Sequence, residues 1–284
     1  MAGPVVHIYR AAESGLNVNS YLVEGESGVV AVDTNLLVSD IEALCARLRA
    51  LKKPLLAVLV THAHPDHFNG ILGLVQDREV PVYATASVGR VIEEIADSKR
   101  AQWSPVYGAE WPAETYYPNS LLADGAQVQL DEMTFTVREV GPAESHADSY
   151  FVLTANEAAS VAFTGDLAFH GMHSYTADGH SGAWLAALDV LGGELADIGA
   201  LYPGHGDPAG PGLLADQRRY LLYYRELIQR LSRGEPQLSE AARSELSTAV
   251  QAFLPDAPLT WMIKLGADAV AAELAAVGTA GNGS

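Results

Sequence analysis

Three histidines and one aspartate occur within the stretch Thr61–His67, which reads THAHPDH. Imidazole nitrogens and carboxylate oxygens are common ligands of divalent metal ions, and a folded core rarely contains so many polar groups packed this closely. The spacing of His62, His64, Asp66 and His67 suits a site for two metal ions. A solvated turn whose polar side chains cap the following helix is the alternative, and we favour the metal site.

The elements around this stretch must place it at a turn from a strand to a helix. Residues 55–60 form an apolar run typical of a buried strand, and residues 67–76 have the pattern of a helix. Ligand-type residues also follow three later strands, at 141–146, 165–166 and 203–206. Because open sheets tend to place functional residues at strand ends, we expect these side chains to gather in one site.

Charge and cysteine content restrict the class of partner and the compartment. The 284 residues include 35 acidic and 17 basic ones, which gives a formal net charge of -18, and 49% of the residues are hydrophobic. Such an acidic surface repels phosphate backbones and anionic lipids, so we expect a small-molecule substrate rather than nucleic acid or a membrane; a homodimer stays open. No signal peptide or membrane-spanning run is visible. Cys45, the only cysteine, lies on an apolar helical stripe, which predicts a core residue and a cytoplasmic location.

The remaining pattern predicts a mixed α/β chain with a helical C-terminal part. Strands are expected at 4–10, 20–23, 29–33, 55–60, 80–84, 127–130, 135–140, 150–153, 160–164 and 199–202. Helices are expected at 39–51, with Ser39 and Glu42 as a capping box, and at 67–76, 87–98 and 181–191. We interpret residues 99–119, rich in Trp and Tyr, as a long ordered loop that covers something. The expected division is a catalytic domain at 1–210, a helical extension packed on it at 211–277, and a flexible tail at 278–284.

The full set of ligand-type residues resembles that of the metallo-β-lactamase-fold hydrolases. This set is, in chain order, His62, His64, Asp66, His67, His146, Asp166 and His205. The resemblance covers residues from about 5 to 210 and implies an αββα sandwich, in which two mixed β-sheets lie face to face with helices outside. It implies a first metal ion held by His62, His64 and His146, and a second held by Asp66, His67 and His205, with Asp166 bridging both. The implied cofactors are two divalent ions, zinc first, with iron or manganese as alternatives.

The resemblance also implies a reaction, namely hydrolysis by a metal-bound hydroxide with Asp66 as a candidate proton donor. An aspartate at the position of Asp166 is typical of the thioesterase-like, lactonase-like and phosphodiesterase-like branches and not of lactam-cleaving enzymes. We therefore expect an ester, thioester or lactone substrate. Lactonases of this family carry tyrosine where Phe169 stands here, and the helical C-terminal part resembles that of the glyoxalase II branch, although its glutathione-binding residues have no match in 213–277.

Three alternatives of other classes stay open. A persulfide dioxygenase-like oxidoreductase would use one iron held by His62, His146 and Asp166. A β-lactam hydrolase and a non-catalytic metal-binding protein of the same fold are the others. Candidate substrate-contacting residues are Phe169, His173, Tyr175, Trp103 and Tyr107. His170, His173 and His180 either line the pocket or make ordinary hydrogen bonds, and Asp33 either orients a ligand histidine or forms a turn.

Overall fold

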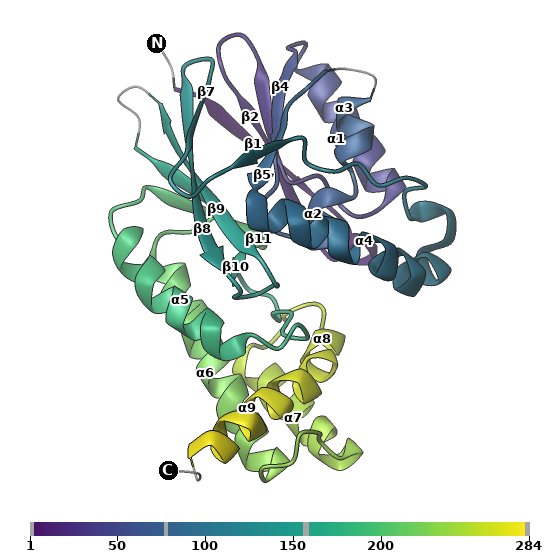
Figure 1. Cartoon of the computed structure of the whole chain (residues 1–284), viewed down its shortest axis with the longest axis vertical. Helices are drawn as coiled ribbons and strands as arrows, with labels where there is room; N and C mark the ends of the chain where they lie inside the picture. The colour runs from purple at the N-terminus through teal and green to yellow at the C-terminus, as the bar shows by residue number, and fades with distance from the viewer. Residues whose placement is uncertain (1–2, 77–78, 156–158, 282–284) are drawn as a thin grey trace.

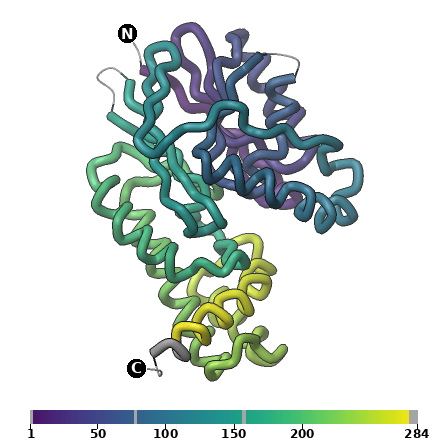
Figure 2. Tube along the Cα trace, in the orientation of Figure 1, coloured from purple at the N-terminus to yellow at the C-terminus, as the bar shows by residue number. Residues whose placement is uncertain are grey.

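The computed structural model describes residues 3–76, 79–155 and 159–281. Two mixed β-sheets pack face to face, helices cover the outer face of each sheet, and a group of C-terminal helices lies at one end (Figure 1). The two ends of the chain lie at opposite ends of the molecule (Figure 2). The predicted αββα sandwich with a helical C-terminal part is therefore confirmed.

The first sheet is built from the N-terminal half of the chain, in the strand order β1-β2-β3-β4-β5-β6. Its strands are β1 (Val5–Arg10), β2 (Asn19–Glu24), β3 (Val29–Val32), β4 (Leu55–Leu59), β5 (Val82–Thr85) and β6 (Ser120–Leu122). The first three are antiparallel and the last four parallel, so β3 belongs to both parts. The uninterrupted apolar sequence of β4 is typical of a parallel strand buried on both faces.

The second sheet has the strand order β11-β10-β9-β8-β7. Its strands are β7 (Gln127–Leu130), β8 (Met133–Gly141), β9 (Asp148–Ala155), β10 (Val161–Phe169) and β11 (Ala200–His205). Only β10 and β11 run parallel, and their register shifts between Phe163 and Phe169. This irregular end of β10 contains Asp166, one of the ligand-type residues predicted from the sequence.

Three apolar clusters hold the layers together. The cluster between the sheets contains inward-facing side chains of both, including Tyr21, Val32 and Leu59 from the first sheet and Phe135 and Phe163 from the second. A second cluster packs helices on the outer face of the first sheet. A third packs the later helices on the second sheet. Cys45 is buried in the second cluster, as its place on the apolar stripe predicts.

The helices divide into those over the first sheet and those near the second. The former are α1 (Val38–Ala50), α2 (Pro65–Phe68), α3 (Ile71–Val75) and α4 (Ala86–Tyr107). The latter are α5 (Ser181–Glu194), α6 (Gly212–Ser232), α7 (Glu240–Phe253), α8 (Trp261–Leu265) and α9 (Ala267–Gly281). Short 3-10 turns lie at Glu13–Gly15 and Gly108–Glu110. Among the described residues, no helix is long and apolar enough to cross a membrane.

The end of α4 differs from the prediction of a loop over 99–119. The helix continues to Tyr107, so Trp103 and Tyr107 lie one turn apart with ring centroids 6.3 Å from each other. Both pack with Trp111 in a small apolar cluster, and this packing outweighs the cost of Pro105 within the helix. Only the part of the expected loop beyond the helix is irregular.

The predicted capping box at the start of α1 is also wrong. Ser39 lies inside the helix, which begins at Val38, and Glu42 makes no capping contact with it among the bonds described. Instead, Glu110 accepts hydrogen bonds from the backbone N–H and the hydroxyl of Ser39, at 3.0 and 2.7 Å. A residue distant in sequence therefore accepts a hydrogen bond from a free backbone N–H group at the start of the helix. At the other end of the chain, α9 runs to Gly281, into the expected flexible tail, whose last three residues lie outside the described part.

Candidate metal centre

The ligand-type residues predicted from the sequence come from strand ends of both sheets. His62 and His64 follow β4, and Asp66 and His67 lie in the first turn of α2, whose N-cap is His64. The predicted helix 67–76 is broken into α2 and α3, with Gly70 as the N-cap of α3. Asp166 lies in β10, and His205 is the last residue of β11.

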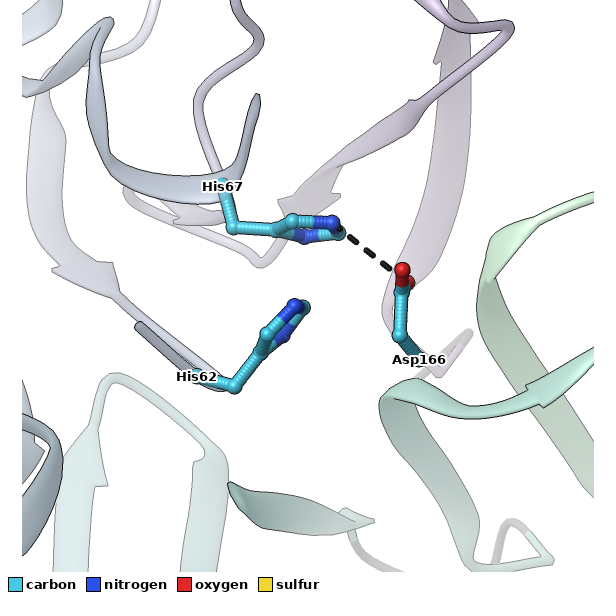
Figure 3. A group of neighbouring side chains, drawn as sticks. All are labelled: His62, His67 and Asp166. Atoms are coloured by element: carbon cyan, nitrogen blue, oxygen red, sulfur yellow. Dashed lines mark ion pairs between the residues drawn. The ribbon is translucent and has the colours of Figure 1, made fainter. Parts of the chain in front are cut away.

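The structure brings these residues into three overlapping groups, each with ligand atoms within 4.8 Å of one another. The groups are His62, His67 and Asp166; His62, His64 and Glu144; and Asp66, His67 and His205. All members are buried. Figure 3 shows the central group, with the rings of His62 and His67 directed toward the space beside Asp166. His62 and His67 each belong to two of these groups and so join the three groups into one centre.

Several polar atoms of this centre are buried without a hydrogen bond, which tests whether cations fit. They are His62 Nε2, His67 Nε2, Asp166 Oδ1 and both carboxylate oxygens of Glu144, none with a hydrogen bond among the described residues. Buried donors and acceptors are normally paired, and an unpaired one costs about 1–3 kcal/mol. Nitrogen and carboxylate oxygen atoms that converge in this way fit divalent cations such as zinc.

Hydrogen bonds from outside the centre fix the orientation of three imidazoles. His67 Nδ1 lies 2.8 Å from Asp33 Oδ2, and His205 Nδ1 donates to the carbonyl of Leu16 at 2.9 Å. His62 Nδ1 lies 3.0 Å from Thr61 Oγ1. In each ring Nε2 is therefore the atom left for a ligand role. The suggestion that Asp33 orients a ligand histidine agrees with this geometry.

His64 is oriented differently, through its other nitrogen. Its Nε2 lies 3.1 Å from Asp178 Oδ2, which leaves Nδ1 facing the centre, 3.0 Å from Glu144 Oε2. The Tyr175 hydroxyl donates to Asp178 Oδ1 at 3.0 Å, and its ring meets His64 edge-on at 5.0 Å. No local sequence signal indicates this place of Asp178 beside His64.

Glu144 groups with His62 and His64 in the structure, whereas the family resemblance implies His146 beside these two histidines. Its side chain is fully buried, with Oε2 3.6 Å from His62 Nε2. The His146 side chain is 46% exposed, and its Nδ1 lies 2.7 Å from His180 Nε2. His146 contacts Asp178 at 3.7 Å but belongs to none of the three groups. The geometry therefore favours Glu144 as the third group beside His62.

A tight turn between β8 and β9 explains this exchange. The backbone N–H groups of Ala143 and Ser145 both donate to Asp148 Oδ2, at 3.1 and 2.9 Å. The Ser145 hydroxyl also donates to the carbonyl of Ala147 at 3.0 Å. These bonds fix the turn so that Glu144 points inward and His146 outward.

The charges of the centre shift the pKa values of its members in opposite directions. Burial raises the pKa of Glu144 to about 8 and that of Asp148 to about 6. Burial alone would raise the pKa of Asp166 too, but His205 and His67 hold it well below its usual range. Burial is the largest single influence on His205 and lowers its pKa, but Asp166 and Asp66 together raise this pKa to about 9. Without a cation, the second group is therefore an ion-paired cluster, whereas at Glu144 the effect of burial outweighs the ion pair with His64.

Two glycines allow the strands to approach this closely. A Cβ on Gly204 would lie 1.9 Å from Asp166 Oδ1, and one on Gly165 would lie 2.5 Å from Thr61 Oγ1. Gly165 also has a φ of 50°, which favours glycine. Both positions were noted only as strand ends, and their neighbours in sequence are the ligand-type residues Asp166 and His205.

A cavity of about 270 Å³ opens onto the centre. Four of the five predicted substrate-contacting residues line it: Phe169, Tyr175, Trp103 and Tyr107. Phe169 stacks on the His205 ring, with centroids 5.0 Å apart and planes 10° apart. Residues of α8 line the cavity as well, although no local sequence pattern indicates their place there.

The other histidines after Asp166 do not line this cavity. His173 is buried behind it, with Nδ1 3.2 Å from the Tyr220 hydroxyl. His170 bonds the carbonyl of Asp207 at 2.7 Å, and His180 pairs with His146. The interpretation of His170, His173 and His180 as residues with ordinary hydrogen bonds fits these positions.

Comparisons with known proteins give a family and a fold. The profile of the Metallo-beta-lactamase superfamily matches residues 14–205, more than half of the chain. An (R)-specific secondary-alkylsulfatase of a Pseudomonas species is 28% identical over 125 residues, 41% of this chain and 18% of the alkylsulfatase. The exodeoxyribonuclease WalJ of Streptococcus pneumoniae is 29% identical over 85 residues, 30% of this chain and 32% of that enzyme. The chain thus spans less than a fifth and about a third of these two proteins.

Solved structures share the fold. A beta-lactamase domain protein from Burkholderia ambifaria superposes with a TM-score of 0.70 at 17% identity, covering 99% of this chain and 88% of that one. A metallo-beta-lactamase from Pontibacter korlensis gives a TM-score of 0.59 at 21% identity, covering 78% and 96%. At these identities the likeness concerns the fold alone.

Proposed function

The chain belongs to the metallo-beta-lactamase superfamily, and we propose that it is a dinuclear metal-dependent hydrolase of a carboxylic ester, thioester or lactone. The observation that supports this most directly is the set of three overlapping groups of buried ligand atoms, several of them unpartnered. In this proposal His62, His64 and Glu144 hold one ion, and Asp66, His67 and His205 hold the other. Asp166 lies between them and serves both.

The chain's own residues would position and protect the reacting groups. Two bound divalent ions, zinc by preference, would supply an activated water and polarise the carbonyl oxygen. Asp33 and Asp178 hold the rings of His67 and His64 in the tautomers that the site needs. The Asp66 carboxylate, which faces the cavity, is placed to hold a proton during departure of the leaving group. The apolar walls exclude bulk water from the scissile bond.

The proposed class of substrate rests on the net charge of the chain. A formal charge of -18 disfavours polyanionic partners, so we keep a small-molecule substrate and no nucleic acid in the proposal. A cytoplasmic location is part of it too, on the ground of the single, buried cysteine.

The test combines metal analysis with a substrate panel. Protein reconstituted separately with zinc, manganese and iron is assayed on aryl esters, acyl thioesters, lactones, a β-lactam and a persulfide under oxygen. We expect two ions per chain and hydrolysis of one of the first three classes, lost on chelation and in Asp166→Asn. One iron per chain with oxygen uptake on the persulfide would replace the proposal with the oxidoreductase alternative. No turnover on any arm with both metal sites filled would favour a non-catalytic metal-binding protein.

An alkyl sulfate is a second candidate substrate, and one observation favours it. Apart from the ligand-type groups, Lys99 is the only charged side chain among the described residues that line the cavity. Its Nζ lies over the Tyr175 ring at 5.9 Å, within reach of an anionic group near the centre. The partial similarity to an alkylsulfatase agrees with this. Sulfate release from a medium-chain alkyl sulfate, lost in Lys99→Met but retained in Lys264→Met, would support it, because Lys264 of α8 does not line the cavity.

A further inference from the structure

We propose that α8 is a specificity element whose Trp261 and Leu265 bind a medium-length apolar acyl chain next to the scissile bond. This inference rests on the proposed hydrolase function but makes a separate claim, because it concerns the C-terminal extension and not the metal centre. Neither the family profile, which ends at residue 205, nor the ligand-type residues say anything of this segment.

The cavity is continuous from the metal centre to α8. Asp166 and His205 line its floor, and Trp261, Met262 and Leu265 line one wall. In Figure 1, α8 lies at the end of the C-terminal helices that is nearest to the sandwich. A substrate group that extends from the carbonyl therefore has α8 beside it.

Two large apolar side chains of α8 are left partly open to this cavity. Trp261 and Leu265 are 43% and 41% exposed, although they lie one helical turn apart on one face. The rest of the helix is fixed: Met262 and Ile263 are buried, and the Tyr224 hydroxyl donates to the carbonyl of Ile263 at 2.6 Å. The open face is therefore held rigidly where it is, and does not result from a loosely packed segment.

The opposite wall is apolar and aromatic as well. Trp103 and Tyr107 of α4 face the cavity, with Trp111 stacked on Tyr107 at a centroid distance of 6.1 Å. These rings belong to a small cluster separate from the three that hold the layers together. Lys99 and Gln102 of α4 also line the cavity, but neither wall presents a carboxylate, so the space between the α4 rings and the open face of α8 suits an uncharged hydrocarbon chain.

The gain from such a chain is large enough to measure. Each methylene group transferred from water to an apolar wall contributes about fourfold to kcat/KM, as long as the chain remains within the cavity. At 25 cal/mol per Å², a tenfold contribution from the indole corresponds to about 55 Å² of the chain covered by it. Removal of Trp261 should therefore flatten the dependence on chain length.

The experiment uses the metal-loaded full chain and a series of p-nitrophenyl esters from acetyl to octanoyl. We expect kcat/KM to rise with acyl length, and the octanoyl-to-acetyl ratio to fall about tenfold in Trp261→Ala and severalfold in Leu265→Ala. Leu222→Ala is the matched control, because Leu222 is 42% exposed on α6 and does not line the cavity. Melting temperature and metal content check that each variant is folded and loaded.

A binding measurement separates failure of this inference from failure of the proposed function. Calorimetric titration with acetate, butanoate, hexanoate and octanoate should show affinity that rises with chain length in the wild type and rises less in Trp261→Ala. That result without turnover of any ester, thioester or lactone would support the α8 site and overturn the hydrolase proposal. Ester turnover with no effect of chain length would overturn the α8 site alone. A change of oligomeric state in Trp261→Ala with an unaltered chain-length profile would assign these side chains to self-association instead.

Discussion

Glu144 provides the sharpest test of the metal centre, because its replacement should affect metal-free and metal-loaded protein in opposite directions. Both of its carboxylate oxygens are buried without a hydrogen-bond partner among the described residues, and burial raises its pKa from 4.5 to about 8. Glu144→Gln has the same shape as the protonated acid but carries no charge at any pH. It therefore removes the charge and leaves the packing.

The change in the free energy of unfolding that Glu144→Gln causes in metal-free protein follows from the pKa shift of Glu144. A carboxyl whose pKa is higher in the folded than in the unfolded state binds its proton more tightly when folded, so stability falls as the pH rises between the two pKa values. For Glu144 this window runs from 4.5 to about 8. At pH 7 the charge costs at most about 3 kcal/mol, at ~1.4 kcal/mol per pH unit. Metal-free Glu144→Gln should be more stable than the wild type by up to this amount at pH 7, and equal to it near pH 4.5.

In metal-loaded protein the carboxylate is needed, and an amide is a weaker ligand. A metal concentration of 1,000 times Kd stabilises the folded state by about 4.1 kcal/mol. If Glu144→Gln weakens one site 100-fold, the same concentration stabilises the variant by only about 1.4 kcal/mol. The stabilisation gained on adding metal should thus shrink by about 2.7 kcal/mol.

Urea unfolding with chelator and with zinc, at pH 5, 7 and 8, measures both effects on the same protein. Glu226→Gln is the control for loss of an exposed carboxylate and should change neither. His146→Ala should also leave the stabilisation by metal near the wild-type value, in contrast to what the sequence pattern suggests. If His146→Ala loses as much of it as Glu144→Gln, or metal-free Glu144→Gln is less stable than the wild type at pH 8, the assignment of Glu144 to this site is refuted.

Three further substitutions probe the rest of the centre. Asp166→Asn should lower turnover and metal content together, measured by kcat/KM and by metal analysis of dialysed protein; full activity would contradict its place between the ions. Asp33→Asn should weaken metal binding about 10–100-fold by releasing the His67 ring, with Kd determined by chelator competition, and an unchanged Kd would show that the ring needs no such support. Gly204→Ala would place a Cβ 1.9 Å from Asp166 Oδ1, so we expect it to displace that carboxylate and reduce metal content, whereas Gly210→Ala, where a Cβ meets nothing within 4 Å, should not.

The fold was predictable where local pattern and tertiary burial agree. The apolar run of β4 and the alternating pattern of β8 each indicate their burial directly, and both strands are present as expected. β6 was missed because its three residues are too few to show a period. The end of α4 was not predicted because proline and aromatic residues locally favour a loop. The packing of Trp103 and Tyr107 against Trp111 instead stabilises the helix.

Asp33 shows how two local interpretations can both hold. It has a φ of 57°, as a residue in a turn after a strand can have. Its carboxylate also accepts hydrogen bonds from the backbone N–H and hydroxyl of Thr61, at 2.9 and 2.8 Å, and lies 2.8 Å from His67 Nδ1. The turn and the orienting role are one arrangement, because the left-handed backbone at Asp33 is what aims its side chain at the loop after β4.

The choice between Glu144 and His146 could not be made from the sequence, and the reason is geometric. The two residues are separated by one position in a turn, where neither the period of a strand nor that of a helix relates neighbouring side chains. Histidine is the more common zinc ligand, so residue type alone favours His146. The outcome depends on Asp148, whose carboxylate collects two N–H groups of the turn and so fixes which side chain faces His62. A carboxylate in place of an imidazole adds a negative charge to the first site, and this additional charge should strengthen its hold on a divalent ion relative to a three-histidine site, while the bound ion becomes a weaker Lewis acid.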